Sequence, residues 1–210
     1  MSILQAVDDF SRLGQFDLIM ADPPWQFATR SAKGVTAKGA GGQYSVMPLD
    51  LVRELPVASL AEKHCLLWLW ATNPMLPQAL QVMAAWGFEF KTAGTWVKRT
   101  RHGKGAFGTG YTLRSANEPF LIGTRGRPVT TRKVRSAIAS GDTDPLTLSS
   151  VTIESVSREH SRKPDEAFAA AELLMPEARR IELFSRQERP GWTVWGNETT
   201  KFSNLEENDQ

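Results

Sequence analysis

Short apolar runs that alternate with helix-like segments constrain the fold of this chain more than any other feature. Residues 15–21 (QFDLIMA) and 64–71 (HCLLWLWA) are predicted to be buried strands, and residues 74–86 carry apolar side chains near helical spacing. The same patterns predict strands at residues 88–98, 119–124, 179–184 and 192–195, and helices at residues 48–60 and 161–176. Strands that alternate with helices predict an α/β fold, in which a mostly parallel central sheet is flanked by helices.

Composition limits the class of protein further. The chain has 210 residues, 41% of them hydrophobic and 23% charged, which is typical of a soluble globular domain. Its one cysteine, Cys65, excludes an internal disulfide, and one cysteine with three histidines cannot form a Cys/His zinc cluster. The apolar run at residues 65–71 is far shorter than the roughly 20 residues of a membrane span, and residues 1–14 do not resemble a signal peptide. We therefore expect a single cytoplasmic domain over residues 1–210, without metal or membrane contact, that ends in a loose tail at residues 203–210.

Positive charge is concentrated in the middle of the chain. Residues 98–135 contain ten Lys and Arg residues and one acid, Glu118, so this segment carries +9 in a chain whose formal net charge is +2. A solvated face is the ordinary explanation of such a run. The segment also carries Phe107, Tyr111 and several glycines, and basic, flexible and aromatic residues together suit a phosphate backbone with bases stacked alongside. We therefore predict that residues 98–150, a basic segment and loop, contact nucleic acid. The side chains predicted to make this contact are Lys98, Arg99, Arg101, Lys104 and Arg114.

The strand at residues 15–21 runs into Asp22-Pro23-Pro24-Trp25, a motif suited to holding an amine. Ligands of parallel sheets bind at the carboxyl ends of the strands, which is where this motif lies. The two prolines remove two N–H donors, so the Asp22 carboxylate and the Pro23 carbonyl become two acceptors at a fixed separation. Trp25 adds a flat apolar face. This arrangement matches the exocyclic amine of a heteroaromatic base, which becomes a better nucleophile when both of its N–H groups are accepted.

A purely structural role is the alternative for this motif, because a Pro-Pro turn followed by a tryptophan can simply end a strand and pack on the core. Four further tryptophans and the cysteine lie in apolar segments and are predicted to be core residues: Trp68, Trp70, Trp86, Trp96 and Cys65.

Further motifs follow Asp-Pro-Pro-Trp in a recognisable order. They are QYSVM at residues 43–47, LWLWATN at 67–73, Gly110-Tyr111 followed by Glu118 and Arg125-Gly126, EHSRKPDE at 159–166, IELFSR at 181–186 and GWTVWGNE at 191–198. With these blocks the chain resembles, over about residues 14–198, the MT-A70 family of N6-adenine methyltransferases. Members of that family transfer the methyl group of S-adenosylmethionine to adenine in RNA or DNA.

The resemblance implies a Rossmann-like methyltransferase fold with a circularly permuted (β-class) motif order. The catalytic half, residues 15–125, would precede the cofactor-binding half, residues 157–200. The implied cofactor is S-adenosylmethionine, released as S-adenosylhomocysteine, with no metal. By position in the motifs, the catalytic residues would be Asp22, Pro23, Pro24 and Trp25, and the residues near the base would be Tyr44 and Glu118. The cofactor-binding residues would be Asp22, Lys163, Phe184, Arg186, Asn197 and Glu198.

Elementary chemistry agrees with part of this assignment. Lys163 at a helix start suits a carboxylate, and Asn197 or Glu198 can accept hydrogen bonds from ribose hydroxyls. The acidic residue that contacts the cofactor's adenine in the family has no assigned match here, because Asp8 and Asp9 do not fall clearly in register.

Together these features predict an S-adenosylmethionine-dependent, site-specific DNA adenine-N6 methyltransferase of bacterial or phage origin. DNA is favoured because the chain is compact and lacks the appended zinc or arginine-rich RNA modules of eukaryotic relatives. The alternatives are an RNA adenine-N6 methyltransferase and a non-catalytic subunit that serves as a nucleic-acid-binding scaffold. A homodimer or a second subunit is compatible with the sequence.

Overall fold

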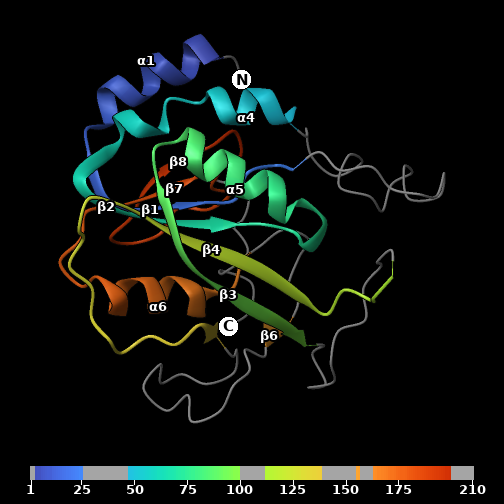
Figure 1. The fold of residues 1–210 in the computed structure, drawn as a ribbon. Helices are drawn as coiled ribbons and strands as arrows, with labels where there is room; N and C mark the ends of the chain where they lie inside the picture. Colours follow the sequence, from blue (N-terminus) through green and yellow to red (C-terminus); the bar gives the residue numbers. More distant parts are fainter. Residues whose placement is uncertain (1–2, 26–46, 100–111, 139–154, 157–162, 200–210) are drawn as a thin grey trace, which may run out of the picture.

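The computed structural model of the chain describes residues 3–25, 47–99, 112–138, 155–156 and 163–199. In these residues helices cover both faces of a central sheet (Figure 1). The helices are α1 (Ile3–Leu13), α4 (Leu49–Glu54), α5 (Leu76–Ala85) and α6 (Asp165–Leu174), with short 3-10 turns at Val57–Ser59 and Asn73–Met75. The strands are β1 (Phe16–Ala21), β2 (Ala61–Trp70), β3 (Glu89–Arg99), β4 (Asn117–Arg125), β5 (Ala137–Ile138), β6 (Ser155–Val156), β7 (Arg180–Leu183) and β8 (Thr193–Trp195).

The sheet has the strand order β5-β3-β4-β2-β1-β7-β8, and β6 also pairs with β3. The pairs β1–β2, β1–β7 and β7–β8 are parallel, whereas β4 runs antiparallel to both β2 and β3. Strands β7 and β8 come last among the strands in the chain, but β7 pairs with β1, the first strand, and β8 pairs with β7. The carboxyl ends of β1, β2, β7 and β8 therefore share one edge, and the start of the antiparallel strand β4 reaches the same edge.

Two apolar clusters pack on the two faces of this sheet. One joins Ile19, Leu67 and Leu183 to buried residues of α1, α4 and α5. The other joins Met20, Trp68 and Phe120 to the buried face of α6. Figure 1 accordingly shows α6 on one side of the sheet and α1, α4 and α5 on the other. The mixed α/β fold predicted from the sequence, with a mostly parallel sheet flanked by helices, is confirmed.

The predictions that rest on a local sequence pattern agree with the structure. The strand predicted at residues 15–21 is β1 and stops at Ala21, directly before Asp22-Pro23-Pro24. The run at residues 64–71 lies in β2, which is central because β1 and β4 flank it. The predicted core tryptophans are buried, with exposed fractions of at most 3%, and Cys65 is fully buried. Burial raises the pKa of the Cys65 thiol to about 12, so this cysteine is inert at neutral pH.

Other elements were not predicted. Helix α1 was missed, although Ala6 and Phe10 place an apolar pair at helical spacing on its buried side. The two-residue strands β5 and β6 were not predicted, and they form by pairing with β3. None of the helices in the described ranges is long and apolar enough to cross a membrane. The single-domain boundaries and the cytoplasmic location stay predictions.

Candidate active site

Asp22 stands at the carboxyl end of β1, where the chain turns through Pro23 and Pro24. Trp25 N–H donates to the Pro23 carbonyl at 2.8 Å, and Met47 N–H donates to the Pro24 carbonyl at 3.0 Å. The Trp25 ring is buried, and its indole N–H donates to the carbonyl of Trp70 at 3.1 Å. The ring therefore fastens the end of β1 to the end of β2. The Pro23 carbonyl keeps a second lone pair, so one acceptor position is still available beside Asp22.

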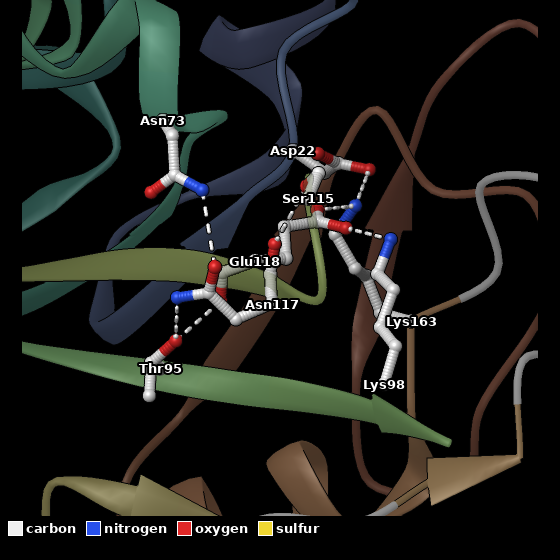
Figure 2. A network of polar contacts seen from close by, with 8 residues as sticks. All are labelled: Asp22, Asn73, Thr95, Lys98, Ser115, Asn117, Glu118 and Lys163. Carbon is white, nitrogen blue, oxygen red and sulfur yellow. Dashed lines mark hydrogen bonds and ion pairs between the residues drawn. The ribbon is translucent and has the colours of Figure 1, made fainter. Parts of the chain in front are cut away.

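Four charged side chains meet at this edge in alternating order. Lys163 Nζ lies 2.7 Å from Asp22 Oδ2 and 2.6 Å from Glu118 Oε1. Lys98 Nζ lies 2.7 Å from the other Glu118 oxygen, Oε2. Figure 2 shows the two lysine side chains pointing at Glu118 and Asp22 from separate parts of the chain. The order Asp22–Lys163–Glu118–Lys98 places two carboxylates and two ammonium groups in one continuous chain, which we call the charge chain.

The fold brings these four residues together from widely separated parts of the sequence. Asp22 follows β1, Lys98 lies near the end of β3, Glu118 lies at the start of β4, and Lys163 lies two residues before α6. In the β3–β4 pair, Glu118 is opposite Trp96, and Lys98 is two residues further along the same strand as Trp96. Side chains two residues apart on a strand share a face, so Lys98 and Glu118 project from the face that α6 covers.

Two tryptophan rings lie against the ammonium groups of the charge chain. Lys163 Nζ lies 5.3 Å from the centroid of the Trp70 ring, and Lys98 Nζ lies 4.7 Å from the centroid of the Trp96 ring. The two rings contact each other edge to face, with centroids 6.3 Å apart. Each ammonium group thus sits over an indole face as well as beside a carboxylate, which stabilises its charge away from water. The side chain of Lys163 is only 8% exposed.

The pKa values of the two carboxyl groups in the charge chain are shifted in opposite directions. Burial pushes the pKa of Glu118 upward, but the charges of Lys163 and Lys98 outweigh burial and lower that pKa to about 2. Burial dominates at Asp22 and raises its pKa above the ordinary value, although Lys163 opposes this. Burial alone would lower the pKa of Lys163, but Asp22 and Glu118 raise it above its ordinary value. Asp22 is therefore the more basic of the two carboxylates.

A second polar network braces the same edge. Asn73, after β2, donates from Nδ2 to Asn117 Oδ1 at 3.1 Å, and Asn117 Nδ2 donates to Thr95 Oγ1 at 2.8 Å. Ser115 Oγ donates to the Asn117 carbonyl at 3.3 Å. Figure 2 shows Asn73, Asn117 and Thr95 beside Glu118, on the side away from the lysines. It links the ends of β2, β3 and β4 around Glu118.

A further buried carboxyl group lies in β7. Glu182 is 8% exposed and pairs in register with Met20 of β1, so it too lies on the face that carries α6. Burial raises the pKa of Glu182 to about 7. Ser185 Oγ lies 2.7 Å from Glu182 Oε2 and 2.7 Å from the carbonyl of Gln187. A hydroxyl has one proton to donate. A protonated Glu182 can donate to Ser185 Oγ while Ser185 donates to Gln187, which makes both contacts hydrogen bonds.

The ends of β7 and β8 form the other half of the edge. Phe184 has a φ of 64°, a left-handed conformation that is uncommon outside glycine and marks a sharp turn directly after β7. Arg186 Nε lies 3.5 Å from Glu198 Oε2, so the two loops face each other. A Cβ on Gly196 would lie 2.5 Å from the Ser185 carbonyl, so this close packing of the two loops requires glycine. Asn197 is exposed beside them.

The structure brings several of the predicted site residues to this edge and leaves others untested. Asp22, Glu118, Lys163 and Lys98 form the charge chain, and Phe184, Arg186, Asn197 and Glu198 lie at the β7–β8 end. Arg114 is exposed and precedes β4 by three residues. Tyr44, Arg101 and Lys104 lie outside the described residues, and only the backbone of Arg99, the last residue of β3, is described.

Sequence reasoning did not identify three residues of this edge and assigned no role to a fourth residue, Asp9. Glu182, Ser185 and Gln187 were not predicted as site residues, although the buried acid inside an apolar strand at residues 179–184 was a usable signal. Asp9, for which no role was assigned, accepts a hydrogen bond from the Trp195 indole N–H at 3.0 Å. This contact ties α1 to β8. Within the described ranges, no group of three or more His, Cys, Asp and Glu side chains is placed to hold a metal ion.

Comparison with known proteins agrees with this architecture. The MT-A70 family model matches residues 16–198. Human N(6)-adenine-specific methyltransferase METTL4 is 29% identical over 194 residues, which cover 91% of this chain and 39% of METTL4. Arabidopsis thaliana N(6)-adenosine-methyltransferase MT-A70-like is 33% identical, over 89% of this chain and 24% of the relative. Type II methyltransferase M.MunI from a Mycoplasma species is 27% identical, over 88% of this chain and 78% of M.MunI.

The fold is that of an S-adenosylmethionine-dependent methyltransferase. The chain belongs to the MT-A70 family of N6-adenine and adenosine methyltransferases, as its motifs predicted. It spans less than half the length of METTL4 and of the Arabidopsis relative, and more than three quarters of M.MunI.

The residues at the edge fit the cofactor that this family uses. S-adenosylmethionine presents a carboxylate, a ribose diol, an adenine amine and a sulfonium cation. Arg186 is a cation suited to the carboxylate, and Glu198 is an acceptor suited to hydroxyl groups. Lys163 already donates to Asp22 and Glu118, so only its third N–H is left for the cofactor. Gln187 Oε1 is buried and meets no hydrogen-bond donor among the described residues, so it is an acceptor without a partner in this part of the edge.

Proposed function

We propose that this chain transfers a methyl group from S-adenosylmethionine to the N6 amine of adenine in DNA. The observation that carries the proposal is the Asp22 carboxylate at the carboxyl end of β1, fixed by Lys163 at 2.7 Å and followed by two prolines. Family membership supports the reaction class and the base. The similarity to M.MunI, whose length the chain largely spans, favours DNA.

Asp22 has two tasks in this proposal. Its carboxylate accepts one N–H of the adenine amine while the Pro23 carbonyl accepts the other, which holds the amine nitrogen in position for attack. When bound, S-adenosylmethionine supplies an electrophilic methyl group. The amine nitrogen would gain the methyl group as the carbon–sulfur bond breaks, and S-adenosylhomocysteine would leave with that electron pair. Asp22 would accept the proton that the nitrogen loses. Its raised pKa suits it to this task better than Glu118, whose pKa is lowered to about 2.

Lys163 and Glu118 support Asp22. Lys163 donates to the carboxylate of Asp22 and orients it, and Glu118 holds Lys163 from the other side. We assign Lys163, Phe184, Arg186, Asn197 and Glu198 to the cofactor, with Gln187 as an additional acceptor. In duplex DNA the target adenine leaves the base stack at a cost of about a few kcal/mol. Tyr44, Arg99, Arg101, Lys104 and Arg114 are proposed to hold the nucleic acid.

An RNA adenine-N6 methyltransferase is the second candidate, because the Arabidopsis relative is named an N(6)-adenosine-methyltransferase. A non-catalytic scaffold is the third, and a second subunit or a homodimer is compatible with all three. The test incubates the chain with methyl-labelled cofactor and matched DNA and RNA oligonucleotides, and identifies the product nucleoside by mass spectrometry. We expect N6-methyladenine in DNA. Labelling of RNA alone would contradict the choice of DNA, and failure to bind S-adenosylmethionine in calorimetry would favour the scaffold.

A further inference from the structure

The basic segment that begins at Lys98 was predicted from its charge to grip a phosphate backbone, but Lys98 itself is already engaged. Its ammonium lies 2.7 Å from Glu118 Oε2 and over the ring of Trp96, on its own strand. The Glu118 side chain is only 12% exposed, whereas that of Lys98 is 32% exposed. A phosphate that attracted Lys98 would have to leave one oxygen of a buried carboxylate without its cation, which is costly.

Charge balance shows what Lys98 contributes to the site. With Lys98 in place, the charge chain holds two carboxylates and two ammonium groups. Without it, Asp22 and Glu118 would share the single ammonium of Lys163. Arg186, beyond β7, also lowers the pKa of Asp22, but weakly compared with Lys163. Two carboxylates on one cation favour uptake of a proton by one of them, and Asp22, the more basic, would take it first.

We propose that Lys98 is a positioning residue for methyl transfer, which holds Glu118 against Lys163 and so keeps Asp22 ionised, rather than a contact to the nucleic-acid backbone. This inference rests on the proposed function. It assigns Lys98 to the charge chain and leaves the backbone contacts to other residues of the basic segment.

The test compares Lys98→Ala with Lys91→Ala, a matched control. Lys91 lies on the same strand and is also ion-paired, to Glu89 at 2.6 Å, but towards the far end of the strand from Glu118. We expect Lys98→Ala to lower kcat about tenfold at neutral pH, with KM for the nucleic acid changed by less than about threefold. The acid limb of the kcat profile should move to higher pH, and Lys98→Arg should restore most of the activity. Lys91→Ala should leave all of these unchanged.

The salt dependence of nucleic-acid binding separates positioning from phosphate contact. Loss of one phosphate contact lowers the slope of log K against log salt concentration by about 0.9 on duplex DNA. We expect Lys98→Ala to keep the wild-type slope and Arg114→Ala to lower it. A lowered slope with an unchanged kcat for Lys98→Ala would overturn the proposal.

A double variant makes the result independent of the proposed function. If Lys98 acts through Glu118, Lys98→Ala combined with Glu118→Gln should lose no more kcat than Glu118→Gln alone. If the wild-type chain transfers no methyl group, the proposed function fails, and the same cycle is then read from thermal unfolding midpoints. Midpoint shifts that simply add would overturn the positioning role, and non-additive shifts would support it.

Discussion

Glu118 and Glu182 lie on the same face of one sheet with exposed fractions of 12% for the Glu118 side chain and 8% for Glu182, yet their pKa values are shifted in opposite directions. Glu118, in β4, meets two ammonium groups at 2.6 and 2.7 Å, and its pKa is lowered to about 2. Glu182, in β7, meets the hydroxyl of Ser185 at 2.7 Å, and its pKa is raised to about 7. Among the described residues, no salt bridge reaches Glu182.

The difference teaches that, at these two glutamates, the partners decide whether the effect of burial on the pKa is reversed. Burial is the largest influence on both groups and pushes both pKa values upward. Two adjacent lysines reverse that influence at Glu118, whereas a neutral hydroxyl does not reverse it at Glu182. The edge therefore has an acid with a lowered pKa, Glu118, between two ammonium groups, and an acid with a raised pKa, Glu182, under the β7–β8 end.

Removal of Lys163 should produce the largest loss of stability, because it removes a cation that Glu118 has and Glu182 lacks. Lys163→Met would leave Asp22 and Glu118 without their shared cation in a largely buried site. We expect the free energy of unfolding at pH 7 to fall by about 3–5 kcal/mol, measured by urea denaturation. Lys163→Arg, which keeps the charge, should lose much less. A loss below about 1 kcal/mol for Lys163→Met would mean that the charge chain contributes little to the fold.

At pH 8, Glu182→Gln should raise the free energy of unfolding, whereas Glu118→Gln should lower it. Because the pKa of Glu182 is raised from 4.5 to about 7, its contribution to stability is full below about pH 4.5 and is lost as pH rises through about 7. Glutamine does not titrate, so Glu182→Gln should be more stable than the wild type at pH 8 by about 3 kcal/mol and nearly equal to it at pH 4.5.

Glu118 provides the matched control for that measurement. Its pKa is lowered from 4.5 to about 2, so its contribution is present above about pH 4.5 and is lost as pH falls through about 2. Glu118→Gln should therefore be less stable than the wild type at pH 8. Urea denaturation at both pH values measures both variants. Equal behaviour of the two variants at pH 8 would refute the assigned difference.

Ser185→Ala should produce the smallest effect. It removes the hydroxyl that joins Glu182 to the Gln187 carbonyl, and we expect a loss of about 1 kcal/mol in the free energy of unfolding at pH 5. When Glu182 is ionised, Ser185 donates to its carboxylate and so lowers the pKa of Glu182. Loss of the hydroxyl should therefore also move the decline of stability to higher pH. A decline at the wild-type pH would show that the hydroxyl does not interact with the carboxyl group.

Much of the fold could be predicted because its signals are local. The apolar runs of β1 and β2 and the proline stop after β1 depend only on neighbouring residues. The two-residue strands β5 and β6 have no such signal, because they exist only through pairing with β3. Helix α1 carried an amphipathic pattern in Ala6 and Phe10 and was predictable in principle.

The candidate site was predictable as a set of residue types but not as a set of contacts. Asp22, Glu118 and Lys163 were identified from their motifs. The pairing of Lys98 with Glu118 depends on the β3–β4 register, which places Glu118 opposite Trp96. The raised pKa of Glu182 depends on which groups surround it after folding. Charge along the sequence favoured a phosphate contact for Lys98, because a charge run does not show which of its members are already paired.

Asp22→Asn tests the central claim most directly, because it removes one negative charge from the charge chain and keeps the shape of the side chain. The measurement is single-turnover transfer of labelled methyl to adenine N6 in an oligonucleotide, with S-adenosylmethionine affinity followed by calorimetry on the same variant. We predict that transfer falls at least about a hundredfold while the dissociation constant of the cofactor changes by less than about threefold. Transfer close to the wild-type rate, or loss of cofactor binding together with transfer, would contradict the role assigned to Asp22.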